Sequence, residues 1–136
     1  MSGRWTARIC GATATALIAC APLAGSEAAE QPSGVAAAPA SASARRDPYD
    51  GDREAVGAGR KLYGAQCARC HGERGEGVGN APSLLSEEVR HASPGALFWF
   101  LTNGDLRRGM PAWSRLSEPR RWQIVAFLRS LDETTK

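Results

Sequence analysis

The sequence predicts a small all-α domain with long loops. Three segments, residues 52–66, 93–103 and 117–131, repeat apolar side chains with helical spacing. No segment alternates apolar and polar residues over a useful length, so no sheet is expected. Glycine gathers in HGERGEGVGN, residues 71–80, which indicates a loop that must turn tightly.

Residues 1–20, MSGRWTARICGATATALIAC, have the features of an export signal. Arg4 and Arg8 supply positive charge, and the apolar stretch after them is too short for a permanent membrane span. The end of the signal has two interpretations. LIAC resembles a bacterial lipobox, in which Cys20 carries the lipid, and GSEAA at residues 25–29 offers ordinary cleavage. We expect a periplasmic location, or one otherwise outside the cytoplasmic membrane, with the lipid anchor left open.

Residues 21–49 are rich in Ala, Pro, Ser and Gly and contain almost no large apolar side chains. Burial in such a segment cannot offset the entropy that is lost when the chain becomes ordered. We therefore expect a flexible linker here and a folded domain at residues 50–136. Because a domain of this size has a marginal core, a disulfide, metal or cofactor is expected to stabilise it.

Capping residues mark the ends of the predicted helices. Asp52 is a suitable N-cap for the helix at residues 52–66. The helix at residues 93–103 begins with Ser-Pro and is followed by glycine, which are typical start and stop signals. The last helix, residues 117–131, also has proline in its first turn, and a shorter turn is expected near residues 86–89.

The strongest chemical motif is CARCH, residues 67–71. Cys-x-x-Cys-His is the attachment pattern for haem c, because two thiols about one helical turn apart can add to the two vinyl groups of one haem. Cys67 and Cys70 would form these thioethers, and His71 would bind the iron as the proximal ligand. We predict one covalently attached haem c per chain, which would also supply the missing core.

Other functions fit the same residues less well. A thioredoxin-like redox pair would need a βαβ context, which is absent. A zinc site could add His91, but adjacent Cys70 and His71 make joint tetrahedral ligation awkward, and no second pair has zinc-finger spacing. The formal net charge is only +3 and no basic run is present, so nucleic acid is not an expected partner.

Met110 is the predicted sixth ligand of the iron. It is the only methionine besides Met1, and it lies in a Gly-Met-Pro turn rather than on a helix face. A thioether in such a turn can reach the iron, whereas a methionine that only fills the core would explain neither observation. His91 is the other candidate, and Lys61 and Lys136 are more remote.

Residues 52–131 resemble the class I monohaem cytochrome c family. The first helix of that family carries Gly-x-x-x-aromatic, here Gly59 and Tyr63, and its last helix ends in an aromatic-Leu pair, here Phe127 and Leu128. The resemblance implies a small cytochrome c fold, with three main helices around one haem and a close helix crossing at the glycine.

The resemblance also implies roles for residues beside the haem. The family has Pro-x-Leu after its haem motif, here Pro82 and Leu84, and the proline carbonyl accepts a hydrogen bond from His71 Nδ1. The segment RGMPAW, residues 108–113, resembles the corresponding segment in a branch of small bacterial cytochromes c. Members of this branch occur beside quinoprotein dehydrogenases or are fused to dehydrogenases and oxidases. In that branch Met110 is the distal ligand, and Trp113 would pack near the haem edge or a propionate.

These features together predict a one-electron carrier of an exported electron-transfer chain, and not an enzyme. With His71 and Met110 both on the iron, no position remains for a substrate, so electrons would pass through the haem edge. The expected partners are redox proteins, with a quinoprotein dehydrogenase as donor and a terminal oxidase or another cytochrome as acceptor. Membrane contact is expected only through a lipid at Cys20.

The side chains near the expected haem edge are mostly arginines. The lysine ring of mitochondrial members is absent, and in its place stand Arg69, Arg107, Arg108 and Arg115. Two alternatives to a mobile carrier stay open. One is a haem sensor or enzyme with a labile sixth ligand, and the other is a fixed cytochrome subunit of a dehydrogenase or oxidase complex.

Overall fold

The computed structural model describes residues 33–133. The predicted export signal, Cys20 and the first part of the predicted linker lie outside these residues. The described chain contains two 3₁₀ helices and six α-helices: η1 (Gly34–Ala37), α1 (Ala40–Ser43), α2 (Arg53–Gln66), α3 (Ala68–His71), α4 (Glu87–His91), α5 (Pro94–Asn103), η2 (Leu106–Arg108) and α6 (Glu118–Glu133). Within this range there is no strand, only an isolated bridge, so the all-α prediction is confirmed.

The three long helices occupy the predicted segments, and the N-termini of α2 and α5 are capped as expected. The Asp52 carboxylate accepts hydrogen bonds from the backbone N–H groups of Glu54 and Ala55, at 2.9 and 3.0 Å. Ser93 Oγ accepts one from the N–H of Ala96 at 3.2 Å, at the start of α5. These bonds satisfy donors that have no partner inside the helix, and so they set where α2 and α5 begin.

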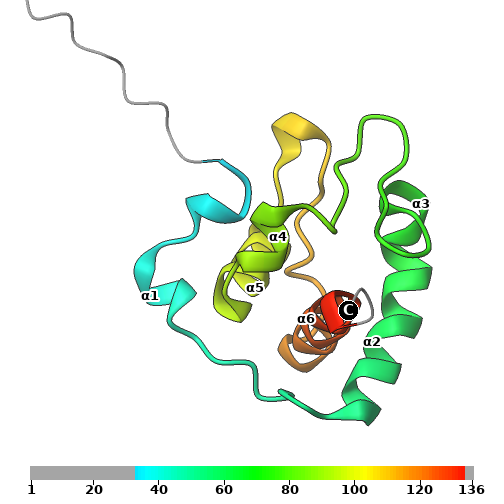
Figure 1. The fold of residues 1–136 in the computed structure, drawn as a ribbon. Coiled ribbons are helices and arrows are strands. Elements are labelled where there is room, and N and C mark those ends of the chain that lie inside the picture. Colours follow the sequence, from blue (N-terminus) through cyan, green and yellow to red (C-terminus); the bar gives the residue numbers. More distant parts are fainter. Residues whose placement is uncertain (1–32, 134–136) are drawn as a thin grey trace, which may run out of the picture.

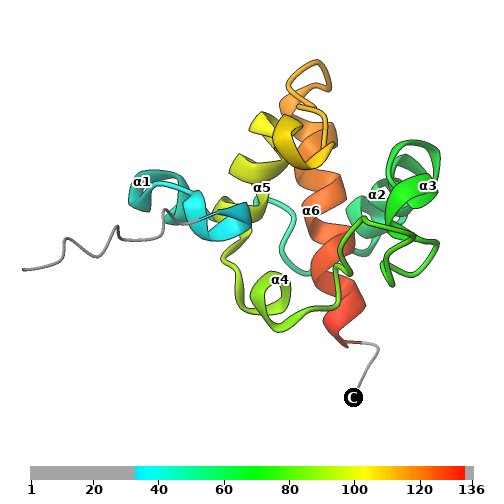
Figure 2. The ribbon, with the colours of Figure 1, turned by 90° about the horizontal axis from the view of Figure 1, so that it is seen from above.

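Helix α6 lies between α2 and α5 and packs against both (Figures 1 and 2). The buried residues form two clusters. The first cluster joins α5 and α6 and consists of Val35, Leu97, Phe98, Leu101, Trp113, Trp122, Ile124 and Val125. The second cluster joins α2 and α6 and consists of Tyr63, Cys67 and Phe127. Leu128, partly buried, packs against both clusters, so α6 connects the two sides of the core.

Residues 33–49 form an N-terminal strap on the outer side of α5 (Figures 1 and 2). The predicted flexible linker is therefore wrong for this part of the chain. Val35 is buried in the first cluster. A Cβ added to Gly95 would lie 2.1 Å from the carbonyl oxygen of Ala42, so the strap and α5 meet backbone to backbone. Small residues favour this close approach, which the composition argument did not consider.

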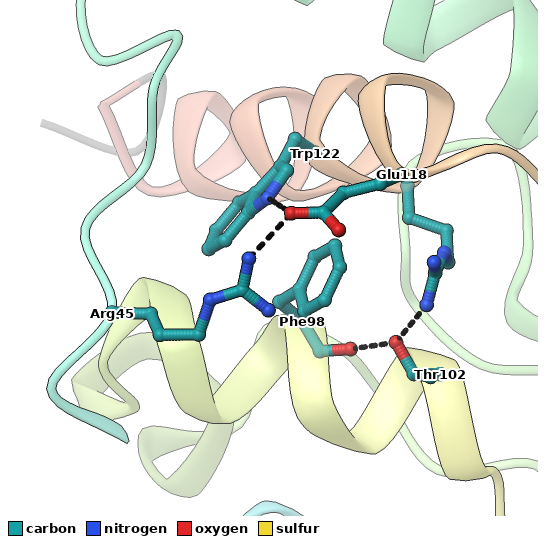
Figure 3. Close-up of polar contacts among 6 residues, drawn as sticks. Arg45, Phe98, Thr102, Glu118 and Trp122 are labelled. Atoms are coloured by element: carbon teal, nitrogen blue, oxygen red, sulfur yellow. Dashed lines mark hydrogen bonds and ion pairs between the residues drawn. The ribbon is translucent and has the colours of Figure 1, made fainter. Parts of the chain in front are cut away.

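Arg45 fastens the end of the strap to α5 and α6 (Figure 3). Its guanidinium carbon lies 4.5 Å from the ring centroid of Phe98 and 5.2 Å from that of Trp122. The same guanidinium pairs with the Glu118 carboxylate, which also accepts a hydrogen bond from Trp122 Nε1 at 3.4 Å. A cation held over two aromatic rings beside a carboxylate stabilises the docked strap, so the folded unit begins well before residue 50.

Candidate functional site

The CARCH motif forms one turn of helix directly after α2. The N–H of His71 donates to the carbonyl oxygen of Cys67 at 2.9 Å, and the N–H of Cys70 donates to the same oxygen at 3.0 Å. Neither cysteine forms a disulfide, and Cys67 is buried in the second cluster whereas Cys70 is exposed. The motif thus presents two sulfurs and an imidazole from a single turn, as the haem attachment pattern requires.

The Cys67 thiol sits in an apolar environment. Burial, and to a lesser extent the neighbouring Cys70, raises the pKa of Cys67 to about 11. The sulfur is therefore neutral at physiological pH. A thioether sulfur is also neutral, so this buried position suits a covalent link to haem.

His71 is held by a hydrogen bond to the loop that follows it. Its Nδ1 lies 3.1 Å from the carbonyl oxygen of Pro82, and the side chain is buried. Because a carbonyl can only accept, Nδ1 carries the proton and the lone pair of the neutral ring is on Nε2. This is the contact that the family resemblance implies, and it leaves Nε2 as the nitrogen that can bind iron.

Glycine conformation brings Pro82 back to His71. Gly75 and Gly77 have positive φ angles of 82° and 86°. At Gly77 a Cβ would lie 2.7 Å from the carbonyl oxygen of Ala81, so no larger residue fits there without a shift. The N–H of Gly77 also donates to the His71 carbonyl oxygen at 2.7 Å. The predicted tight turning of the glycine-rich loop is therefore present, and it serves to place Pro82.

Met110 ends a small hairpin that contains η2. The N–H and carbonyl groups of Met110 exchange two hydrogen bonds with those of Asp105, each 2.9 Å long. Gly109 has the left-handed φ of 84°, and the Asp105 carboxylate caps η2 at the N–H of Arg108. The Met110 side chain is half-buried and packs against the first cluster. Sequence reasoning missed Asp105, whose signal was only that of an acidic residue before a short turn.

Trp113 is buried in the first cluster. The backbone N–H of Trp113 donates to the carbonyl oxygen of Leu101 at 3.1 Å, and the Arg115 guanidinium carbon lies 5.2 Å from the centroid of the Trp113 ring. Trp113 therefore joins the Met110 hairpin to α5, while its predicted contact with a haem stays a prediction.

The predicted site residues lie on two sides of α6. Cys67 belongs to the second cluster, whereas Trp113 belongs to the first cluster and Met110 packs against the first cluster. The loop after α3 and the hairpin that contains η2 lie at the same end of the molecule (Figure 1). Each carries an exposed large apolar side chain, Val78 at 55% and Leu106 at 79%.

His91 lies on the surface of α4. It is exposed, and its Nδ1 is 3.2 Å from the Glu87 carboxylate. Across residues 33–133, no group of three or more His, Cys, Asp or Glu side chains is placed to hold a metal ion. The arrangement therefore gives no support to a zinc site that combines His91 with the CARCH residues.

Comparison with known protein families agrees with the CARCH attachment motif. The model of the family described as cytochrome C oxidase, cbb3-type, subunit III matches residues 54–128. The chain belongs to this family. No curated protein matches it. As a cbb3-type cytochrome c domain, it has a haem-based role in electron transfer and a covalently bound c-type haem.

The residues of this cbb3-type domain fit the haem that the family implies. The two thiols lie on one turn, and the imidazole has its proton fixed on Nδ1 by Pro82. In the part of the chain that the structure describes, no helix is long and apolar enough to cross a membrane.

Proposed function

We propose that the protein is an exported one-electron carrier whose haem c iron is bound by His71 and Met110. The observation that carries the proposal is the hydrogen bond from His71 Nδ1 to the Pro82 carbonyl, because it orients the ring and makes Nε2 a stronger ligand. A haem c bound in this way supplies a one-electron iron couple, and methionine with histidine favours the reduced state and raises the potential.

Each residue of the site has a distinct task in this proposal. Cys67 and Cys70 would hold the cofactor covalently, through thioether bonds to its two vinyl groups. Pro82 orients His71. The bridge from Asp105 holds the Met110 backbone in a fixed turn, so the thioether needs little reorganisation when the iron changes charge.

The hairpin that contains η2 offers a surface for redox partners. Leu106 is 79% exposed, and Arg107 and Arg108 beside it are also exposed. An apolar centre with positive charge around it suits a brief encounter with an acidic partner, and its rate should fall as salt increases. Arg69 and Arg115 are exposed as well, and we propose that they also contribute positive charge for the encounter with a redox partner.

The family description favours one particular arrangement of partners. It names subunit III of a cbb3-type oxidase, so a terminal oxidase is the acceptor we favour, with the domain either fixed in that complex or moving to it. A quinoprotein dehydrogenase is the donor we propose. Copurification of the oxidase in fixed stoichiometry would support a bound subunit, and recovery of the cytochrome alone would support a mobile carrier.

Spectroscopy of the purified holoprotein tests the ligand assignment. We expect a far-red sulfur-to-iron band in the oxidised protein and no binding of carbon monoxide by the resting reduced protein. His91→Ala should leave both results unchanged. A missing band together with carbon monoxide binding would instead support a sensor or enzyme with a labile sixth ligand.

Export is the remaining part of the proposal. Domains of this family are typically exported or membrane-associated, and haem c attachment in bacteria takes place outside the cytoplasm. We propose a lipid on Cys20 as the form of attachment. Labelled palmitate should enter the wild-type protein and not Cys20→Ala, and no label in the wild type would indicate ordinary signal cleavage.

A further inference from the structure

Tyr63 is a buried aromatic residue whose hydroxyl group is not needed for packing. The side chain is 2% exposed, and its ring lies 5.1 Å from that of Phe127, centroid to centroid. Both rings pack in the second cluster, between α2 and α6. A phenylalanine would make the same ring contacts, so the hydroxyl calls for a separate explanation.

The hydroxyl group binds the backbone immediately after His71. Tyr63 Oη donates to the carbonyl oxygen of Gly72 at 2.7 Å in a buried setting. Gly72 has a φ of 80° and is the residue at which α3 ends and the chain turns into the following loop. The bond therefore fastens the first residue of that loop to α2.

A short series of hydrogen bonds leads from Gly72 to Pro82. The Gly72 carbonyl also accepts from the N–H of Gly75 at 3.3 Å. The Gly75 carbonyl in turn accepts from the N–H of Leu84 at 2.7 Å and from Ser83 Oγ at 3.2 Å. The two residues after Pro82 thus depend on Gly75, and Gly75 depends on the carbonyl that Tyr63 holds.

We propose that the Tyr63 hydroxyl is a positioning group for the proximal ligand, acting through Gly72 and Gly75 on the bond between Pro82 and His71. The inference rests on the proposed role of His71 as iron ligand. A well-placed Pro82 carbonyl increases the electron density on the imidazole, and a more electron-rich ligand favours the oxidised iron. Without the hydroxyl, the loop has more freedom and the His71 bond weakens on average.

The test is Tyr63→Phe in the holoprotein, with Tyr49→Phe as its matched control. Tyr49 is partly buried and packs against the first cluster, away from the loop. We expect Tyr63→Phe to keep the covalent haem and the far-red band. Its midpoint potential should rise, and exchange of the His71 Nδ1 proton, followed by NMR, should become several times faster. Tyr49→Phe should change neither quantity.

A second measurement strengthens the hydroxyl instead of removing it. The sequence has two tyrosines, so 3-fluorotyrosine in a Tyr49→Phe background replaces Tyr63 alone. The more acidic phenol is a stronger donor, and the potential should move in the direction opposite to that of Tyr63→Phe. An unchanged potential and proton exchange rate in both proteins would overturn the inference. A wild type without the far-red band would instead contradict the Met110 assignment.

Discussion

The carbonyl oxygen of Gln123 on α6 lies 1.9 Å from the position that a Cβ on Gly59 of α2 would occupy. The same Cβ would lie 3.0 Å from the Cβ of Phe127. The two helices therefore touch through the backbone, and their crossing depends on the missing side chain.

Gly59→Ala should force α2 away from α6. Because the obstacle is backbone, we expect a loss of about 2–3 kcal/mol in the free energy of unfolding of the holoprotein, measured by denaturant titration. Gly57→Ala and Gly64→Ala are matched controls on the same helix, since a Cβ at either position meets nothing within 4 Å. Those two should be neutral or stabilising by up to about 1 kcal/mol. Equal effects at all three glycines would contradict the close crossing.

Met110→Ala should remove the proposed distal ligand and leave the attachment turn intact. We expect covalent haem at normal yield, a lower midpoint potential, and binding of carbon monoxide or azide that the wild type does not show. Redox titration and absorption spectroscopy measure these changes. An unaltered potential and spectrum would refute Met110 as ligand.

Cys67→Ala with Cys70→Ala should abolish covalent haem. Leu128 packs against both clusters, and without the haem few other contacts would join them. We therefore expect the domain also to lose its cooperative unfolding and much of its helical circular dichroism. Conservative replacement of the exposed surface residue Arg46 by Lys should do neither. A double variant that stays helical and cooperative would show that the cofactor is not what completes the core.

Arg45→Ala should loosen the strap without reaching the haem ligands. Its side chain is 44% exposed, so we expect a modest loss of about 1 kcal/mol in stability. Cleavage within residues 33–49 by a protease should become faster, as followed by mass spectrometry. Arg46→Ala, next to it and exposed, is the control. If both variants were cleaved at the wild-type rate, the stacked arginine would not be what holds the strap.

Because the hydroxyl group of Tyr63 is buried, we expect the free energy of unfolding to fall at high pH. Burial raises the pKa of Tyr63 to about 12, from the ordinary value of 10.0. The unfolded chain therefore loses this proton first, so the contribution is complete below pH 10 and declines as the pH rises towards 12. The decline amounts to about 2 kcal/mol. Denaturant titrations of the holoprotein between pH 9 and about 12 should show it in the wild type and not in Tyr63→Phe.

Local signals predicted the helices and the attachment turn. Caps such as Asp52 and Ser93 act on neighbouring N–H groups, and CARCH needs only one turn of backbone, so both can be seen in a short stretch of sequence. The hydrogen bond between His71 and Pro82 was reached only through the family resemblance. Its geometry depends on the positive φ angles of the glycines between them, and composition alone does not specify those.

The strap could not be predicted because its contacts are distant in sequence. Arg45 meets Phe98, Glu118 and Trp122, which a local composition argument cannot connect to a segment rich in alanine and proline. Asp105 was missed for a related reason. An aspartate before two arginines is typical of a solvated turn, and only the fold shows it closing the hairpin on Met110.

The strap also determines where the described chain enters the domain. Arg108 Nη2 donates to Ser33 Oγ at 3.0 Å, so the first described residue lies against the hairpin that contains η2. Anything that precedes Ser33 is thus attached at this end of the molecule. With a lipid on Cys20, even a fully extended chain would leave at most about 45 Å between the bilayer and the hairpin. Such a tether would keep the end that carries Met110 within reach of the membrane surface, where an integral acceptor would meet it.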